Sequence, residues 1–412
     1  MPRFIQLIVP LLALFISACK ESEYQRLQDT PAAGITLLQL NPAAGFAMPV
    51  VPDANPLTDA KIELGRHLFY DKQLSSNQQQ SCESCHEQSK AFSDGTALPH
   101  GTTGDLLARN SQTLTNVAYN INYTWANPRL TTLEQQILIP LTAEDPIELG
   151  INDGNLSHIL QRFRDRLLYQ QLFSAAFPND ADPFSLANII KALASFNRIL
   201  ISDRSAFDKG QLSESAQRGR DLFFSEKADC FHCHDSFNFS QSSKNVNSLT
   251  IPSQRFFNNG LYNLSQEGDY PQNNQGAFEV TGKAEDKGSF RPPTLRNIEL
   301  TAPYMHDGSI QTLEGIVEFY ANGGRQIQAS GDIDNLAIIN ESLGQPANAI
   351  RHLAGDGRAN PNKLANGFVS GFEATAQEKA DLVNFLKSLT DHEFINDLRF
   401  ANPFITTQEP SL

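Results

Sequence analysis

The sequence has little positive charge and no phosphate-binding glycine loop. Its 32 Lys and Arg residues are outnumbered by 46 Asp and Glu residues, and the formal net charge is −14 at pH 7. Nucleic acids bind basic surfaces, so an acidic chain of this kind is a poor candidate for nucleic-acid binding. A basic protein partner is compatible with the charge on electrostatic grounds alone.

Long hydrophobic runs are also scarce. The run IQLIVPLLALFI, which follows Arg3, is too short to span a bilayer as a permanent helix and is typical of a signal-peptide core. A buried N-terminal helix is the alternative. The string ISAC, which ends at Cys19, resembles a bacterial lipobox. We therefore predict a lipoprotein signal peptide over residues 1–18, a lipidated Cys19 and a periplasmic protein held to the membrane by acyl chains only. Lys20 does not resemble an inner-membrane retention signal, which favours the outer membrane.

Cysteine is the third scarce residue type, and its arrangement is informative. Two pairs are each followed by histidine, in CESCH at 82–86 and CFHCH at 230–234. Cys-x-x-Cys-His is the attachment signature of c-type haem, whose iron is bound by the adjacent His. A four-cysteine zinc site and a redox dithiol are alternatives, but neither requires a His after both pairs. The sequence therefore predicts two covalent haems, held by Cys82, Cys85 and His86 and by Cys230, Cys233 and His234.

A repeated segment precedes the two motifs. LTDAKIELGRHLFYDK at 57–72 is similar to LSESAQRGRDLFFSEK at 212–227, and Gly65 matches Gly219. Each segment begins with a Ser or Thr that could cap a helix. Each then predicts an amphipathic helix with a glycine on its packed face, where a second helix can approach closely.

Apolar residues at helical spacing over 183–200 and 375–391 predict the two crossing helices. Strand-like alternation is rare, so we predict an all-α fold with long loops. The predicted architecture is two tandem cytochrome-c-like domains whose haems face the domain interface. The first haem domain covers 56–205 and the second covers 206–400, after an N-terminal tether over 19–55.

Methionine is scarce as well, and this bears on function. Once the signal peptide is removed, Met48 and Met305 are the only methionines. His/Met ligation is common in electron-transferring haems, and Met48 lies outside either predicted domain core. Two haems could serve an electron carrier, or an enzyme in which one iron face is open to peroxide. The scarcity of Met favours the enzyme.

Four strings around the two motifs carry a family resemblance. They are RNSQTLTNVAYN (109–120), TWANPRLTTLEQQILIPLTAEDPIELG (124–150), FRPPTLRNIELTAPYMHDG (290–308) and TLEGIVEFYANGG (312–324). Over most of its length the chain resembles the bacterial di-haem cytochrome c peroxidase family and, within it, the MauG-like branch. There it is most similar to the MbnH-like enzymes, which are usually paired with a copper-binding partner protein.

The resemblance implies roles around the first haem. That haem would react with H2O2, with Gln136 and Glu148 in its distal pocket and Trp125 between the two haems. A carboxylate near the iron can move a proton from the inner to the outer peroxide oxygen. The spacing before Glu148 departs from the family motif, so Glu144 is the alternative carboxylate. His100 is the candidate for a ligand that would close the site, which we expect to be open.

The resemblance also implies a ligand for the second haem. Tyr320 lies fourteen residues after His306 and matches the axial position, where MauG-like members have tyrosine. Met305 is the alternative ligand. Phenolate is a hard, anionic donor that favours oxidised iron, whereas thioether is soft and neutral. One Ca²⁺ is implied between the haems, with matched positions Asn110, Thr301 and Pro303.

Tyr320 favours one enzymatic interpretation over the others. In that interpretation H2O2 generates a high-valent bis-Fe(IV) state, which oxidises Trp or Tyr of a periplasmic partner protein. The alternatives are a reductive cytochrome c peroxidase supplied by a small cytochrome or cupredoxin, and a non-enzymatic di-haem electron carrier. MauG itself has a surface Trp two residues before its second haem motif, where this chain has Ala228. Oxidising equivalents would therefore leave through Tyr or Phe side chains, or by another face.

Overall fold

The computed structural model describes residues 46–253, 255–262, 270–272, 274–324 and 371–405. The predicted signal peptide, Cys19 and residues 19–45 of the predicted tether lie outside these described residues. Within them there are isolated β-bridges but no strand, and long loops join the helices, so the predicted all-α class is confirmed. The α-helices are α2 (Asp59–Tyr70), α3 (Leu133–Thr142), α4 (Leu156–Arg164), α5 (Leu167–Ala176), α6 (Leu186–Arg198), α7 (Glu214–Phe223), α8 (Phe231–His234), α9 (Phe278–Thr281), α10 (Leu313–Ala321), α12 (Ala376–Lys387) and α13 (His392–Ile395). The 3-10 turns are η1 (Lys72–Leu74), η2 (Cys82–Ser84), η3 (Gln88–Lys90), η4 (Val117–Tyr119), η5 (Ala284–Asp286) and η6 (Ile298–Leu300).

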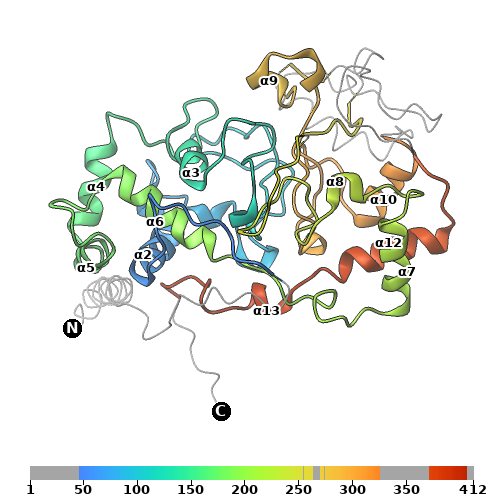
Figure 1. Ribbon diagram of the computed structural model, residues 1–412. Helices are drawn as coiled ribbons and strands as arrows, with labels where there is room; N and C mark the ends of the chain where they lie inside the picture. The colour runs from blue at the N-terminus through green and yellow to red at the C-terminus, as the bar shows by residue number, and fades with distance from the viewer. Residues whose placement is uncertain (1–45, 254, 263–269, 273, 325–370, 406–412) are drawn as a thin grey trace, which may run out of the picture.

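The helices gather in two halves, with α2 to α6 in one and α7, α8, α10 and α12 in the other (Figure 1). Each half contains one close helix crossing, of α2 with α6 and of α7 with α12. A Cβ on Gly65 would lie 2.0 Å from the carbonyl oxygen of Ala192, and one on Gly219 would lie 1.9 Å from that of Asp381. No side chain fits at either crossing, so glycine is required there, and both predicted partner helices are confirmed.

The two repeat helices begin where the sequence predicts. The Thr58 side chain accepts a hydrogen bond from the backbone N–H of Lys61 at the start of α2. Ser213 caps α7 in the same way through the N–H of Ala216. Such caps satisfy backbone donors that have no partner inside the helix. The local sequence therefore sets where both helices start.

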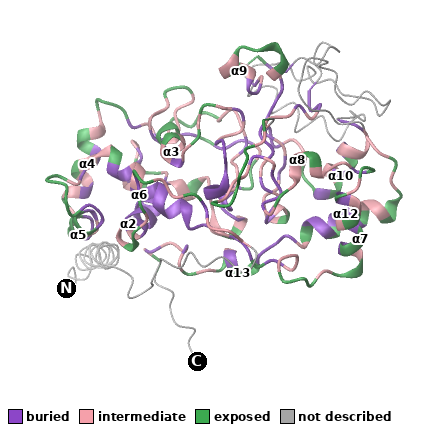
Figure 2. Cartoon of the chain, viewed as in Figure 1, coloured by how far each residue is buried: buried purple, intermediate pink, exposed green. Residues whose placement is uncertain are grey.

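Hydrophobic side chains form a core in each half and a smaller cluster between the halves. Buried residues concentrate on the inward sides of the helices (Figure 2). Phe69 and Phe196 meet where α2 crosses α6, with ring centroids 5.2 Å apart. Phe223 and Phe385 meet in the same way where α7 crosses α12, also at 5.2 Å. The two segments that are similar in sequence therefore also pack in the same way. The third, smaller cluster contains Trp125.

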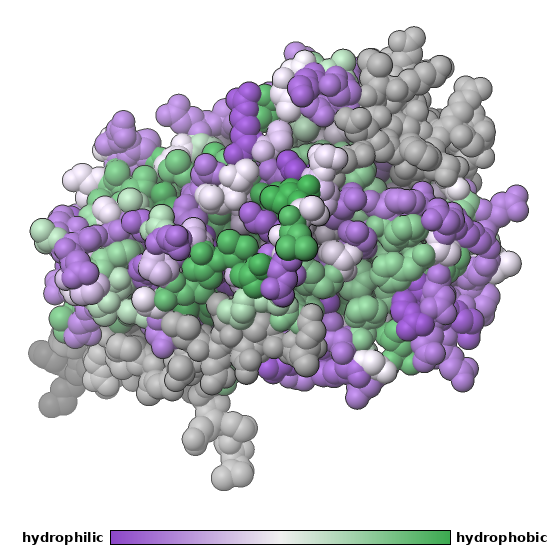
Figure 3. Space-filling view, viewed as in Figure 1, coloured by the Kyte–Doolittle hydropathy of each residue, from purple (hydrophilic) through white to green (hydrophobic). Residues whose placement is uncertain are grey.

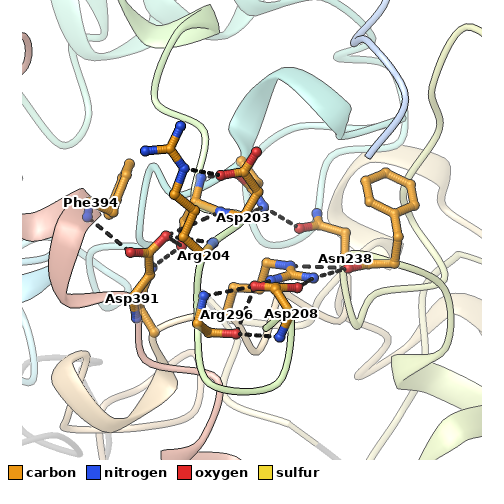
Figure 4. Close-up of polar contacts among 12 residues, drawn as sticks. Asp203, Arg204, Asp208, Asn238, Arg296, Asp391 and Phe394 are labelled. Atoms are coloured by element: carbon orange, nitrogen blue, oxygen red, sulfur yellow. Dashed lines mark hydrogen bonds and ion pairs between the residues drawn. The ribbon is translucent and has the colours of Figure 1, made fainter. Parts of the chain in front are cut away.

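Buried polar contacts fix the segment that joins the halves (Figure 4). The backbone N–H groups of Asp203 and Arg204 donate to Oδ2 of Asp391 at 3.1 and 3.0 Å. Arg296 binds both carboxylate oxygens of Asp208, at 2.8 and 2.9 Å. Bidentate, charge-assisted bonds of this kind are strong and directional. The linker is therefore fastened to the second half and to the residues just before α13.

Both ends of the described chain pack across the predicted domain bounds. Phe394 and Phe400 belong to the core of the first half, and the Tyr70 hydroxyl donates to the carbonyl oxygen of Phe400 at 2.5 Å. Near the other end, the Arg296 guanidinium lies 4.5 Å from the Phe46 ring centroid. The bounds 206–400 and 19–55 did not anticipate these contacts, because they join residues far apart in the sequence.

The surface mixes hydrophilic residues with hydrophobic patches on the face drawn in Figure 3. Large exposed hydrophobic residues include Val246, Leu249 and Ile251, in the loop that follows the second haem motif. None of the described helices has the length and apolar character needed to cross a membrane.

Candidate haem sites and their surroundings

The first Cys-x-x-Cys-His motif forms one tight turn. η2 begins at Cys82, and Cys85 and His86 follow it directly. Nδ1 of His86 lies 2.9 Å from the carbonyl oxygen of Phe92. A carbonyl can only accept, so Nδ1 carries the proton and Nε2 keeps its lone pair for iron. Burial lowers the pKa of His86, which also favours the neutral, ligating form.

The second motif repeats this arrangement. Cys230 directly precedes the single turn α8, which contains Cys233 and His234, and Nδ1 of His234 lies 2.9 Å from the carbonyl oxygen of Phe239. Burial lowers the pKa of His234 to about 4. Both predicted proximal ligands are therefore oriented in the way that metal-ligating histidines usually are.

The zinc alternative fails on geometry. Among the described residues, the group of ligating side chains that comes close enough to share a metal ion is Glu226, Asp229 and His232, without any cysteine. The four motif cysteines form no disulfide. Burial raises the pKa of each of their thiols to about 12, whereas zinc binds thiolates. Neutral thiols that are not paired with one another fit attachment to haem vinyl groups.

A large cavity opens beside the second motif. The non-atom space in this cavity and its mouth amounts to ≈ 1710 Å³, part of which is open solvent. Its walls include the motif residues Cys230, Cys233 and His234. The cavity wall also contains residues singled out in the sequence: Trp125, Asn110, Thr301, Pro303, Met305, His306 and Tyr320. The fold thus gathers around one cavity residues that lie up to 210 positions apart in the sequence.

Two buried donors in the cavity wall fit the propionate groups of a haem. Arg291 is 3% exposed, and burial lowers its pKa to about 10. Its Nη2 donates to Oε1 of Gln112 at 2.8 Å, but its Nη1 and the Gln112 Nε2 find no acceptor in the described part of the protein. Buried donors are rarely left unpaired, and a buried cation calls for an anion. The backbone of Gln112 also lies beside His86, so this pair lies between the two motifs.

The two candidate ligands of the second haem lie in the same cavity and share a neighbour. The Asn259 amide lies beside the Tyr320 hydroxyl, and its Nδ2 donates to Sδ of Met305 at 3.4 Å. Burial raises the pKa of Tyr320. Asn259 therefore contacts both candidate ligands. His306 stacks on Phe290, with ring centroids 3.6 Å apart.

Of the two candidate carboxylates for the first site, Glu148 has the environment that proton transfer needs. Burial raises its pKa to about 7, and its charge acts on both Cys82 and Cys85. Glu144 is exposed. A carboxyl group that titrates near neutral pH can both accept and return a proton. Glu148 thus combines closeness to the first motif with a suitable pKa, and the assignment to Glu148 remains a prediction.

The other residues predicted for the first site are Gln136 and His100. Gln136 is half-buried on α3, and the loop after α3 folds back so that the Leu149 N–H donates to the carbonyl oxygen of Pro140 at 2.9 Å. This brings the chain around Glu148 next to α3. His100 is exposed, with its Nδ1 2.9 Å from the carbonyl oxygen of Gly104. Such a position does not favour His100 as a distal iron ligand.

Trp125 connects the predicted calcium position to the second site. Its indole N–H donates to the carbonyl oxygen of Asn110 at 2.7 Å, and its ring lies 6.3 Å from that of His306. Asn110, Thr301 and Pro303 all line the cavity. Neutral oxygens supplemented by water are ligands that Ca²⁺ accepts. All three positions line the same cavity, and the calcium site remains a prediction.

Sequence reasoning missed three residues of this site, Gln112, Asn259 and Arg291. None of them stands at a ligand spacing from a haem motif, and their types are common in loops. Their importance comes from burial without a charge partner and from position beside Tyr320, neither of which can be read from local sequence.

Two haem-attachment motifs in a helical fold define a c-type di-haem protein, and comparison with known proteins shows which family it belongs to. A family model described as di-haem cytochrome c peroxidase matches residues 59–217. The chain is 32% identical over 329 residues to the cytochrome-c peroxidase IdrP1 of Denitromonas iodatirespirans, covering 72% of this chain and 81% of that protein. It is 33% identical over 297 residues to the methylamine utilization protein MauG of Methylophilus methylotrophus, covering 70% and 81%.

The chain therefore belongs to the di-haem cytochrome c peroxidase and MauG family, as the sequence strings predicted. It is a peroxide-dependent oxidoreductase with two c-type haems. A crystal structure of a MauG-like protein associated with microbial copper homeostasis superposes with a TM-score of 0.80 at 44% identity, covering 89% of this chain and 99% of that one. Relatives carry both peroxidase and MauG names, so the family alone leaves the reducing substrate open.

Proposed function

We propose that this protein uses H2O2 to oxidise Trp or Tyr side chains of a periplasmic partner protein, in the manner of a MauG-like oxidase. The observation that carries the proposal is the position of Tyr320 in the wall of the second haem cavity, together with the motif residues Cys230, Cys233 and His234. When bound, two haems supply iron that H2O2 can oxidise, and a phenolate ligand stabilises oxidised iron. Such a pair stores oxidising equivalents and does not favour a reductive cycle.

At the first site, Glu148 would act as the base that takes a proton from peroxide and then returns it to the departing oxygen. Its raised pKa of about 7 suits both steps at neutral pH. Gln136, on the neighbouring α3, would orient the peroxide by hydrogen bonding. Because Glu148 would return the same proton that it takes, the transfer needs no proton from bulk water. A half-buried carboxyl group can therefore carry it out.

Between the sites, Trp125 would couple the two haems electronically. Its indole N–H is held by the Asn110 carbonyl oxygen, which fixes the ring plane. A Ca²⁺ bound by Asn110, Thr301 and Pro303 would keep this region rigid. The ion would also place positive charge next to the haem carboxylates.

In the cell, the protein would be exported and anchored to the outer membrane through lipidated Cys19. A partner for such an enzyme is a small periplasmic protein that exposes an oxidisable Trp. The family resemblance and the name of the structurally similar MauG-like protein make a copper-binding protein the first candidate to test.

The test is product analysis. The haem-loaded protein is mixed with H2O2 and with a small exported, Trp-bearing protein whose gene lies beside its own, and the partner is analysed by mass spectrometry. We expect an oxidised Trp or Tyr that depends on both H2O2 and the enzyme. In Tyr320→Phe this product should be lost, while the first haem should still respond to peroxide.

The alternatives give different results. A reductive peroxidase would consume H2O2 only with a reduced cytochrome or cupredoxin, and would leave the partner's mass unchanged. A pure electron carrier would show no haem absorption change with peroxide. Met305 lies in the same cavity as Tyr320, so loss of the native haem spectrum in Met305→Leu would favour the reductive peroxidase.

A further inference from the structure

Beside the second haem cavity lies a group of stacked aromatic rings centred on His306. The Phe290 ring lies parallel to the imidazole at 3.6 Å and 10°. Trp125 lies 6.3 Å from His306 on one edge, and Tyr262 lies 6.0 Å from it. Since Trp125 and Tyr262 both pack around one imidazole ring, the two oxidisable rings are within reach of direct electron transfer.

Tyr262 has the hydrogen bond that oxidation of a phenol requires. The side chain is fully buried, and its hydroxyl donates to Oδ2 of Asp307 at 2.7 Å. Oδ1 of Asp307 accepts from the Ser309 N–H at 3.0 Å, which holds the carboxylate in place. A phenol that loses an electron becomes a strong acid, so a base within hydrogen-bond distance makes the oxidation possible.

Tyr270 provides an internal comparison. Its ring lies 6.3 Å from His306, nearly as close as that of Tyr262, and it is also buried. Its hydroxyl, however, donates to the amide oxygen of Asn258 at 2.8 Å. An amide is a far weaker base than a carboxylate. Two tyrosines at almost the same distance from His306 therefore differ in the acceptor of their phenolic proton.

We propose that Tyr262 is a redox-active tyrosine, with Asp307 as its proton acceptor. The inference rests on the proposed function, because the oxidant is an oxidising equivalent that the enzyme takes from H2O2. In the step, Tyr262 gives one electron toward Trp125 and its phenolic proton to Asp307. The O–H bond breaks, and a neutral tyrosyl radical and a protonated Asp307 carboxyl group form. The electron passes by way of Trp125 and reduces the oxidising equivalent taken from H2O2 by one electron.

This assignment supplies a route that the neighbourhood of the second motif lacks. Ala228, two residues before that motif, is 8% exposed and has no ring to oxidise. Tyr262 instead offers an oxidisable ring that packs beside the same imidazole as Trp125. Oxidising equivalents would reach Tyr262 from Trp125 across the His306 ring, which lies 6.3 Å from Trp125 and 6.0 Å from Tyr262.

The experiment uses the haem-loaded, full-length protein with one equivalent of H2O2 and no partner protein. Samples are frozen within milliseconds to seconds and examined by electron paramagnetic resonance, and haem absorption is followed in parallel. Protein grown with ring-deuterated tyrosine identifies a tyrosyl signal without any substitution. Tyr262→Phe, Tyr270→Phe and Asp307→Asn are then compared at equal haem content.

We expect a tyrosyl signal in the unsubstituted protein and in Tyr270→Phe, and its loss in Tyr262→Phe. In Asp307→Asn it should form more slowly by about 10²-fold or more, as for other losses of a proton acceptor. A normal haem response to peroxide without a tyrosyl signal, or with a signal that survives Tyr262→Phe, overturns the inference and leaves the proposed function standing. A protein whose haems do not respond to H2O2 overturns both.

Discussion

The proton-transfer role of Glu148 makes a quantitative prediction about pH. Burial raises the pKa of this carboxyl group to about 7, and only its ionised form can take a proton from peroxide. Roughly half of the molecules hold it ionised at about pH 7, but only ~1% at about pH 5. The rate of the first haem's reaction with H2O2 should therefore fall roughly 50-fold between these pH values. An ordinary glutamate, with a pKa near ~4.3, would stay mostly ionised over the same interval and would change the rate little.

The assay is stopped-flow absorption of the haem bands after mixing with H2O2. Glu148→Gln should slow the reaction by about 10²–10⁴-fold and remove the pH dependence. The matched control is Glu144→Gln, in the same loop but exposed, which should keep both the rate and the profile. A flat profile in the unsubstituted protein would refute the reasoning. So would a normal rate in Glu148→Gln together with a slow rate in Glu144→Gln, which would move the role to Glu144.

Three further predictions follow from the site and the fold. Tyr320→Phe should change the resting absorption spectrum of the second haem, whereas Met305→Leu should leave it intact; the reverse result would assign the ligand to Met305. Gly219→Ala should destabilise the protein by about 1–3 kcal/mol, as expected for overpacking, because a Cβ would lie 1.9 Å from the Asp381 carbonyl oxygen. Gly154→Ala, whose nearest neighbour would be a side-chain atom at 3.2 Å, is the control in thermal unfolding, and equal melting temperatures would contradict the crossing geometry. Removal of Ca²⁺ by a chelator should weaken electronic coupling between the haems and slow partner oxidation while both haems stay attached; unchanged kinetics in calcium-free protein would remove the ion from the proposal.

The proximal side of both haem sites can be predicted from the sequence because its chemistry is local. Two thiols and an imidazole within five residues form the signature that predicts haem attachment, whereas the Nδ1 contacts that leave Nε2 available to the iron come from the fold. The repeat around Gly65 and Gly219 is also local, since helix caps and apolar spacing operate within a few turns. These features led to the haem number, the all-α class and the family, all of which are confirmed.

The return of the chain at its C-terminal end could not be predicted in the same way. Phe394 and Phe400 follow the helix that completes the second half, yet they pack into the core of the first half. Both are apolar side chains, which would suit either core. The contact with the Tyr70 hydroxyl joins positions 330 residues apart, and no local pattern encodes such a pairing.

The sequence by itself predicted the two haem-attachment motifs, their proximal histidines and the helices that cross near them, because each depends on residues close together in the chain. Only the tertiary structure decided which carboxyl group is buried beside the first motif and which donors are left without an acceptor in the cavity wall. It also decided that Tyr262 meets a carboxylate while Tyr270 meets an amide. The physical reason is that burial and the hydrogen-bond partner set the chemistry of a titratable or oxidisable group. Both are properties of packing between distant segments.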